Sequence, residues 1–212
     1  MNDKLRLNKN ALREQNDRLR SLLEFLPTLQ LRQRQLQAAL GRVHRRREQH
    51  AAAWHRRRAE VEPWAPLLRT LAPDAGPYAR VQEVVTRPDD VAGVTVPQLD
   101  EVRFQPGEPS LLATPLGFDD AVAVLRAAAR HRAQARVLEQ QHELLAQELA
   151  RTSQRINLYD EVLIPQARRN IRRLRVYLGD QRIAAVCRAK LAKTKVVARR
   201  ARPRGGDEHG HH

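Results

Sequence analysis

Residues 5–43 read LRLNKNALREQNDRLRSLLEFLPTLQLRQRQLQAALGRV, a stretch in which leucine returns at two positions of a seven-residue repeat. Steps of seven from Leu5 reach Leu12, Leu19, Leu26, Gln33, Leu40, Arg47, Trp54 and Val61. Steps of seven from Leu22 reach Leu29, Leu36 and Val43. The residues between these positions are mainly charged or amide-bearing. Apolar positions at this spacing, with polar faces between them, predict one long helix of a coiled coil.

Prolines set the expected course of this helix. Pro27 lies inside the repeat, where it removes one backbone donor, so we expect a bend rather than a stop. Pro63 and Pro66 follow the repeat, and we expect the helix to end by Glu62.

The next segment, residues 63–117, holds nine of the twelve prolines. Residues 64–71 could form a short helix. Residues 78–85, 91–96 and 99–104 read as short extended pieces separated by proline and aspartate. We predict a small Pro-rich segment that contains a short helix and a β-hairpin.

A second long helix is predicted from Phe118 onward. Asp119 and Asp120 suit a helix N-terminus, where their charge meets the helix dipole. No glycine interrupts the chain again until Gly179, and the repeat breaks near Pro165. Apolar residues follow steps of three, four or seven at Leu138, Leu145, Leu149, Ile156, Tyr159, Leu163, Ile171, Leu174 and Tyr177.

Two long helices around a short segment predict a mainly α fold, a long antiparallel two-helix coiled coil, or helical hairpin. We expect residues 5–61 to pair with residues 118 to about 200, with the Pro-rich segment as a small knob at the turn end. The predicted organisation is an N-terminal coiled-coil helix (1–62), the middle segment (63–117), a C-terminal coiled-coil helix (118–202) and a disordered tail (203–212). The histidines of the tail would bind a metal only adventitiously.

Composition supports this class and limits the function. Aromatic residues make up 4% of the chain, which is too few for a typical β-sandwich or barrel. Cys187 is the sole cysteine, so a disulfide scaffold is excluded, and no apolar run is long enough to cross a bilayer. We expect a soluble cytoplasmic protein. With 39 Lys and Arg against 24 Asp and Glu, its surface indicates an acidic partner: nucleic acid, anionic lipid or acidic protein.

The motifs of an enzyme are missing. No Gly-rich phosphate loop occurs, and Lys193-Thr194 lacks the glycines that such a loop needs. The adjacent pairs Asp89-Asp90 and Asp119-Asp120 point to different faces, so a turn and an N-cap are their expected roles. Basic neighbours could lower the pKa of Cys187, but a lone cysteine without a histidine nearby is more typical of a structural residue. We predict no catalytic, cofactor-binding or metal-binding residues.

The end of the chain is strongly basic. Residues 166–204 contain fourteen Lys or Arg and one acid, Asp180. This charge repels itself, which favours a partner of negative charge. A DNA-binding basic region is one interpretation, but no groove-reading fold or stacking aromatics accompany it.

Residues 152–174, TSQRINLYDEVLIPQARRNIRRL, resemble the R-[VI]-N-x-[LF]-E-x-[VL]-[VL]-I-P signature of the D subunit of V-type and A-type rotary ATPases. Val96–Leu99 and Leu112–Pro115 are similar to the middle segment of that family, and Arg182–Lys195 resembles the C-terminal end of its bacterial branch. The first helix departs from the commonest pattern. Where a typical member opens with Pro-Thr-[KR], this chain has LNKNALR from Leu7, which resembles a divergent bacterial subgroup.

The resemblance implies a central-stalk rotor shaft, one copy per complex, without catalytic residues or cofactors. Its termini would lie inside a ring of alternating catalytic and regulatory subunits (A and B type). Its knob, with the small F subunit of the stalk, would face the cup-shaped C (or d) subunit on the membrane ring. The shaft would support ATP synthesis or ATP-driven H+ or Na+ transport, on the cytoplasmic side of the inner membrane and without inserting into it. Asn157 would lie near the seam and fix its register, and Pro165 would bend the helix.

Two other classes of function remain open on the sequence. One is a nucleic-acid-binding coiled coil, which salt-sensitive DNA binding would favour. The other is a scaffolding coiled coil that forms homodimers, which an intramolecular hairpin would argue against.

Overall fold

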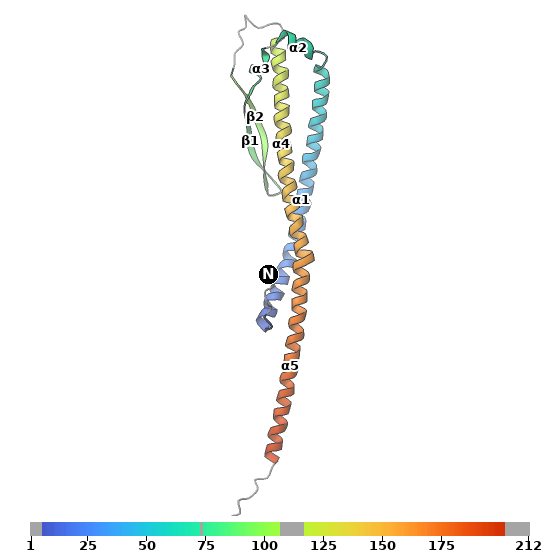
Figure 1. Ribbon diagram of the computed structural model, residues 1–212, viewed down its shortest axis with the longest axis vertical. Helices are drawn as coiled ribbons and strands as arrows, with labels where there is room; N and C mark the ends of the chain where they lie inside the picture. Colours follow the sequence, from blue (N-terminus) through green and yellow to red (C-terminus); the bar gives the residue numbers. More distant parts are fainter. Residues whose placement is uncertain (1–5, 73, 107–116, 202–212) are drawn as a thin grey trace, which may run out of the picture. The chain divides into compact units, whose positions relative to one another are not determined.

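The computed structural model describes residues 6–72, 74–106 and 117–201. The predicted tail, Leu5 and the Leu112–Pro115 piece lie outside the described residues. In chain order the elements are α1 (Lys9–Val61), α2 (Ala65–Leu71), α3 (Ala75–Tyr78), β1 (Val81–Val91), β2 (Val94–Phe104), α4 (Phe118–Asn157), the π-helical turn η1 (Leu158–Leu163) and α5 (Ile164–Ala201). Long helices with one small antiparallel sheet confirm the mainly α class and the helical hairpin (Figure 1).

The chain divides into two compact units. We call Thr28–Ile156 the sheet unit, and Met1–Pro27 with Asn157–His212 the terminal unit. Each unit contains a stretch of α1 and a stretch from the second half of the chain.

α1 begins with a side-chain cap and buries its heptad positions. The Oδ1 atom of Asn8 accepts a hydrogen bond from the amide of Ala11 at 2.7 Å, which satisfies one of the free donors of the first turn. The helix continues through Pro27, as expected. The heptad leucines from Leu12 to Leu40 are buried or half-buried, whereas Leu31, which lies outside the repeat, is 56% exposed.

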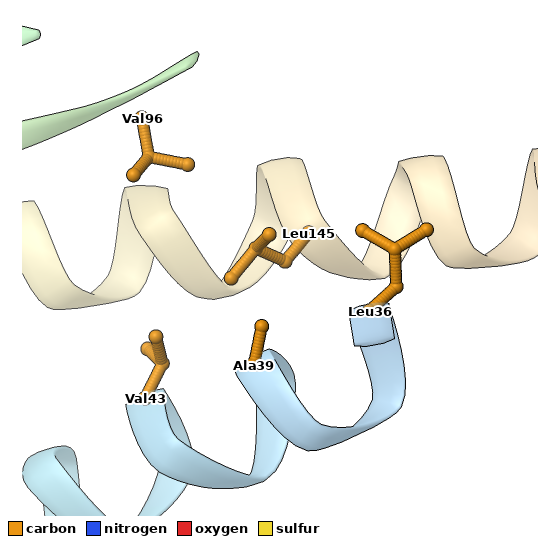
Figure 2. Packing of buried hydrophobic residues seen from close by; sticks show 5 residues of the cluster. All are labelled: Leu36, Ala39, Val43, Val96 and Leu145. Atoms are coloured by element: carbon orange, nitrogen blue, oxygen red, sulfur yellow. The ribbon is translucent and has the colours of Figure 1, made fainter. Parts of the chain in front are cut away.

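In the sheet unit, α1 and α4 run antiparallel. Arg32 pairs with Glu148 at 3.1 Å and Arg47 with Glu139, so residue numbers rise on one helix as they fall on the other. Their shared core contains five buried residues from three elements, Leu36, Ala39, Val43, Val96 and Leu145. Figure 2 shows Val43, Ala39 and Leu36 along α1 on one side of Leu145, with Val96 near the strand on the other side of the α4 ribbon.

The sheet is one long β-hairpin, not three short pieces. Ala92 (φ 55°) and Gly93 (φ 74°) form the turn, and both positive φ angles are typical of the two-residue turns whose twist suits a hairpin. The Asp90 carboxylate accepts a hydrogen bond from the Gly93 amide at 2.9 Å, which confirms a turn role for this aspartate. The predicted extended piece 91–96 is therefore wrong, because the turn divides it.

Prolines are tolerated inside both strands because they face each other. Pro88 of β1 lies opposite Pro97 of β2. The Val91–Val94 pair closes the turn, and counting alternate pairs from there makes the two prolines a non-hydrogen-bonded pair. A missing amide hydrogen costs no ladder bond at such a position. Proline spacing alone therefore does not end these strands.

The hairpin lies along α4 rather than projecting away from the helices (Figure 1). Gln141, a buried amide of α4, donates from Nε2 to the carbonyl of Pro97 at 2.6 Å. Arg126 and Arg130 place their guanidinium groups 5.3 and 5.1 Å from the ring centre of Phe104, a cation–π geometry. These contacts attach both ends of β2 to the same helix.

In the terminal unit, α5 packs on the first part of α1 through buried residues at steps of three and four, Ile164, Ala167, Ile171 and Leu174. Asn170 donates to the side-chain oxygen of Gln15 at 3.3 Å across this pair. The break expected near Pro165 is the π-helical turn η1, which ends at Leu163, two residues before that proline. Asn157 is exposed, so the expectation that it lies near the seam and fixes the register is wrong.

Candidate partner-binding surface

The last part of α5 is exposed in the terminal unit. Asn170 lies opposite Gln15, and one-to-one antiparallel pairing from there brings Arg6 level with Gly179. From Asp180 to Val197 every residue is exposed except the half-buried Ala184. We call residues 181–197 the overhang. The expectation that this helix pairs with α1 as far as about residue 200 is wrong, because the described residues beyond Gly179 are exposed rather than packed in a seam.

The face of α5 that packs on α1 changes character where the overhang begins. Steps of seven from the buried Ile171 and Leu174 continue as Leu178, Gln181, Ala185, Arg188, Ala192 and Lys195. After Leu178 this face carries only small, polar or basic residues, so it no longer offers a coiled-coil seam.

The overhang instead presents apolar side chains on another face. Ile183, Cys187 and Leu191 follow one another at steps of four, and Val186 and Val197 lie beside them at 100° per residue. Ile183 is 65% exposed and Leu191 63% exposed. A row of uncovered apolar residues on a helix indicates a binding surface.

Basic residues flank this apolar row, and Lys190 lies within it, between Ile183 and Val197 at 100° per residue. At the same helical spacing, Arg188 and Lys195 lie on one side of it, and Arg182 and Lys193 on the other. None of the ion pairs found within the described residues involves a basic residue of the overhang. The surface can therefore offer apolar contact and positive charge to the same partner.

A second exposed apolar surface lies in the sheet unit, where α1 ends. Trp64 is 61% exposed, and Leu67 and Leu125 are also exposed. Beside it runs a groove lined by Trp54, Arg57, Arg58, Val61, Glu62, Ala65, Val124, Ala127 and Ala128. Sequence reasoning missed this surface, although two large apolar residues at Trp64 and Leu67 next to helix-ending prolines were the available signal.

The residues weighed for chemistry do not form a reaction centre. Asp89 and Asp90 lie in β1 beside the turn, and Asp119 and Asp120 lie in the first turn of α4, as expected for an N-terminus. Cys187 is exposed on α5. Within the described residues, no three His, Cys, Asp or Glu side chains converge as metal ligands would. The same part of the chain contains no helix that is both long and apolar enough to cross a membrane.

Comparison with known proteins decides the family. The model of the family described as the D subunit of ATP synthase matches residues 11–194, which include most of the overhang. The chain belongs to the ATP synthase D-subunit family. The D subunit is a structural part of its complex rather than a catalytic one, which confirms the prediction of a non-catalytic chain.

Curated relatives of this D subunit match over nearly their whole length. The D subunit of a V-type ATP synthase from Borreliella burgdorferi is 32% identical over 194 residues, covering 92% of this chain and 96% of the relative. Those from Chlamydia pneumoniae and Chlamydia felis are 30% and 29% identical, covering 98% and 94% of this chain and 99% and 97% of the relatives. The resemblance inferred from residues 152–174 is thereby confirmed.

Proposed function

We propose that this subunit is the central rotor shaft of a V/A-type ATP synthase, which carries torque between the nucleotide-binding ring and the ion-translocating membrane ring. The observation that carries the proposal is the overhang. A helix with sixteen exposed residues among the seventeen of the overhang, both apolar and basic, is suited to insertion into a surrounding partner. A ring of catalytic and regulatory subunits (A and B type) provides such a partner.

The two kinds of surface on the overhang suit a shaft that must turn. Apolar contact is not directional, and partly solvated ion pairs contribute on the order of 1 kcal/mol or less each. Neither holds the shaft strongly at one angle. Because Leu191 and Lys193 project about 160° apart around the helix, each site of the ring would meet a different chemistry as the shaft rotates. That difference can report the shaft's angle to each catalytic site.

The remaining partners are assigned to the sheet unit. Its exposed Trp64 surface and its long β-hairpin offer apolar and polar contact area for the small F subunit of the stalk and the cup-shaped C (or d) subunit on the membrane ring. The rotor shaft would be present once per complex and peripheral to the cytoplasmic side of the inner membrane.

Photo-crosslinking in native membranes tests this proposal. A photoreactive amino acid is placed at Leu191 in the overhang and, in a matched variant, at Arg46, an exposed position on α1 of the sheet unit. We expect the Leu191 probe to form adducts with the nucleotide-binding ring subunits and the Arg46 probe to form none with them. Adducts of Leu191 with nucleic acid, with a second copy of this chain, or with neither ring subunit would overturn the proposal.

A further inference from the structure

Three aromatic rings stack between the two helices of the sheet unit. His50 of α1 and His131 of α4 lie face to face, with ring centres 4.0 Å apart and planes 3° apart. Trp54, one turn beyond His50, also stacks on His131, at 4.5 Å and 12°. All three side chains are half-buried. One ring from α4 therefore contacts two rings from α1, which makes the stack a direct link between the helices.

Two carboxylates, one from each helix, line the groove beside the stack. The groove beside it is lined on α1 by His44, Arg47 and Glu48, and on α4 by Glu139. Glu48 lies 3.2 Å from the Nε2 atom of His44, and Glu139 is paired with Arg47. Each carboxylate thus has a basic side chain of its own beside it.

Burial and neighbouring histidines disfavour protonation of His50 and His131. Burial lowers the pKa of His50 below its ordinary value of 6.5. Burial also lowers the pKa of His131, and the nearby His50 and His55 lower it further. The Trp54 face attracts a cation and acts in the opposite direction on His131. If both rings were protonated, two positive charges would lie about 4.0 Å apart and repel each other.

We propose that the His50–His131–Trp54 stack is a proton-sensitive clamp that holds α1 to α4 while its histidines are neutral and loosens when they are protonated. The sign follows from linkage. A histidine whose pKa is lower in the folded protein contributes stability that is complete above the unfolded value, about 6.5. That contribution is lost as the pH falls through 6.5 toward the lowered pKa. Acidification of the surrounding solution would therefore weaken the sheet unit at this level.

Trp54 makes the clamp directly observable. In a Trp64→Phe background Trp54 is the only tryptophan, because the chain has two. A protonated imidazole in contact with an indole quenches its fluorescence, so the emission of Trp54 reports the charge on His131. Two measurements on the full-length chain follow from this: a fluorescence titration from pH 8 to pH 5, and urea unfolding at pH 7.5 and pH 5.5.

His131→Phe keeps an aromatic ring in the stack but cannot be protonated. His142→Gln is the matched control, because His142 lies on the same helix outside the stack. In the parent we expect Trp54 emission to fall with a midpoint below pH 6.5, and the urea midpoint to be lower at pH 5.5. In His131→Phe the emission step should disappear and the urea midpoint should fall less. His142→Gln should behave as the parent.

Two results would overturn the clamp. One is a pKa of His131 at or above 6.5, measured by NMR on the unmutated chain, which also decides the matter if His131→Phe fails to fold. The other is an equal drop of the urea midpoint, between pH 7.5 and 5.5, in the parent and in His131→Phe.

Discussion

Truncation of Leu145 to alanine should destabilise the sheet unit by about 3–5 kcal/mol. Leu145 is fully buried and shares its cluster with α1 residues Leu36 and Val43 and with Val96 of β2. Full burial of a leucine side chain contributes about 1.5–3 kcal/mol by transfer from water. A void left between two helices and a sheet adds a further cost, because the surrounding atoms relax only in part.

Equilibrium urea unfolding, followed through Trp54 in a Trp64→Phe background, measures this change. We expect a lower urea midpoint with an unchanged slope, which identifies a loss of stability rather than a change in the unfolded state. Leu125→Ala is the control. Leu125 lies on the same helix but is 41% exposed, so its truncation should cost about 0.5 kcal/mol or less. Equal costs for the two variants would refute the assignment of the core to this cluster.

Two further predictions concern the β-turn and the helix register. Gly93→Ala should destabilise the chain by about 1–2 kcal/mol, because φ is +74° although the new methyl group has room. Gly76→Ala, at a position with no atom within 4 Å of the added carbon and a φ outside the positive range, should cost less. Cysteines at Gln15 and Asn170, whose side chains are hydrogen-bonded across the terminal unit, should be cross-linked within one molecule by a short bifunctional thiol reagent in a Cys187→Ser background.

The glycine prediction and the cysteine-pair prediction can each be contradicted by a specific result. Equal urea midpoints for the two glycine variants would show that the turn is not strained by a side chain. The cross-linking control places cysteines at residues 10 and 190, in the same Cys187→Ser background. From the observed register, residue 190 lies about fifteen residues beyond the partner of residue 10, or roughly 22 Å along the helix. Ready cross-linking of this distant pair by the same short reagent would mean that the register is wrong.

The helices could be predicted because their signals are local. The heptad leucines from Leu12 to Leu40 recur within one segment, and burying them requires only a facing helix, whichever residues it supplies. Aspartates at the start of α4 and prolines after α1 likewise mark helix ends through short-range physical effects.

Two predictions were wrong because they depend on the register of the paired helices, which no local pattern encodes. The register decides whether Asn157 meets the seam. It also decides where α1 stops covering α5. The His50–His131 stack has the same origin, because eighty residues separate its partners along the chain. The division of the β-hairpin was missed for a different reason. Pro88 and Pro97 look like strand breakers until their pairing places them opposite each other.

The coupling of ion transport to ATP hydrolysis, measured with a neutralised overhang, addresses the rotor role most directly. Arg188, Lys190 and Lys193 are changed together to glutamine in the intact complex. The matched control is a triple change to glutamine at Arg45, Arg46 and Arg56, which are exposed on α1. We predict that both complexes assemble with normal composition, and that the overhang variant alone moves fewer ions per ATP consumed. A failure of the overhang variant to assemble, or an unchanged ion yield per ATP, would contradict a role for this surface in carrying torque.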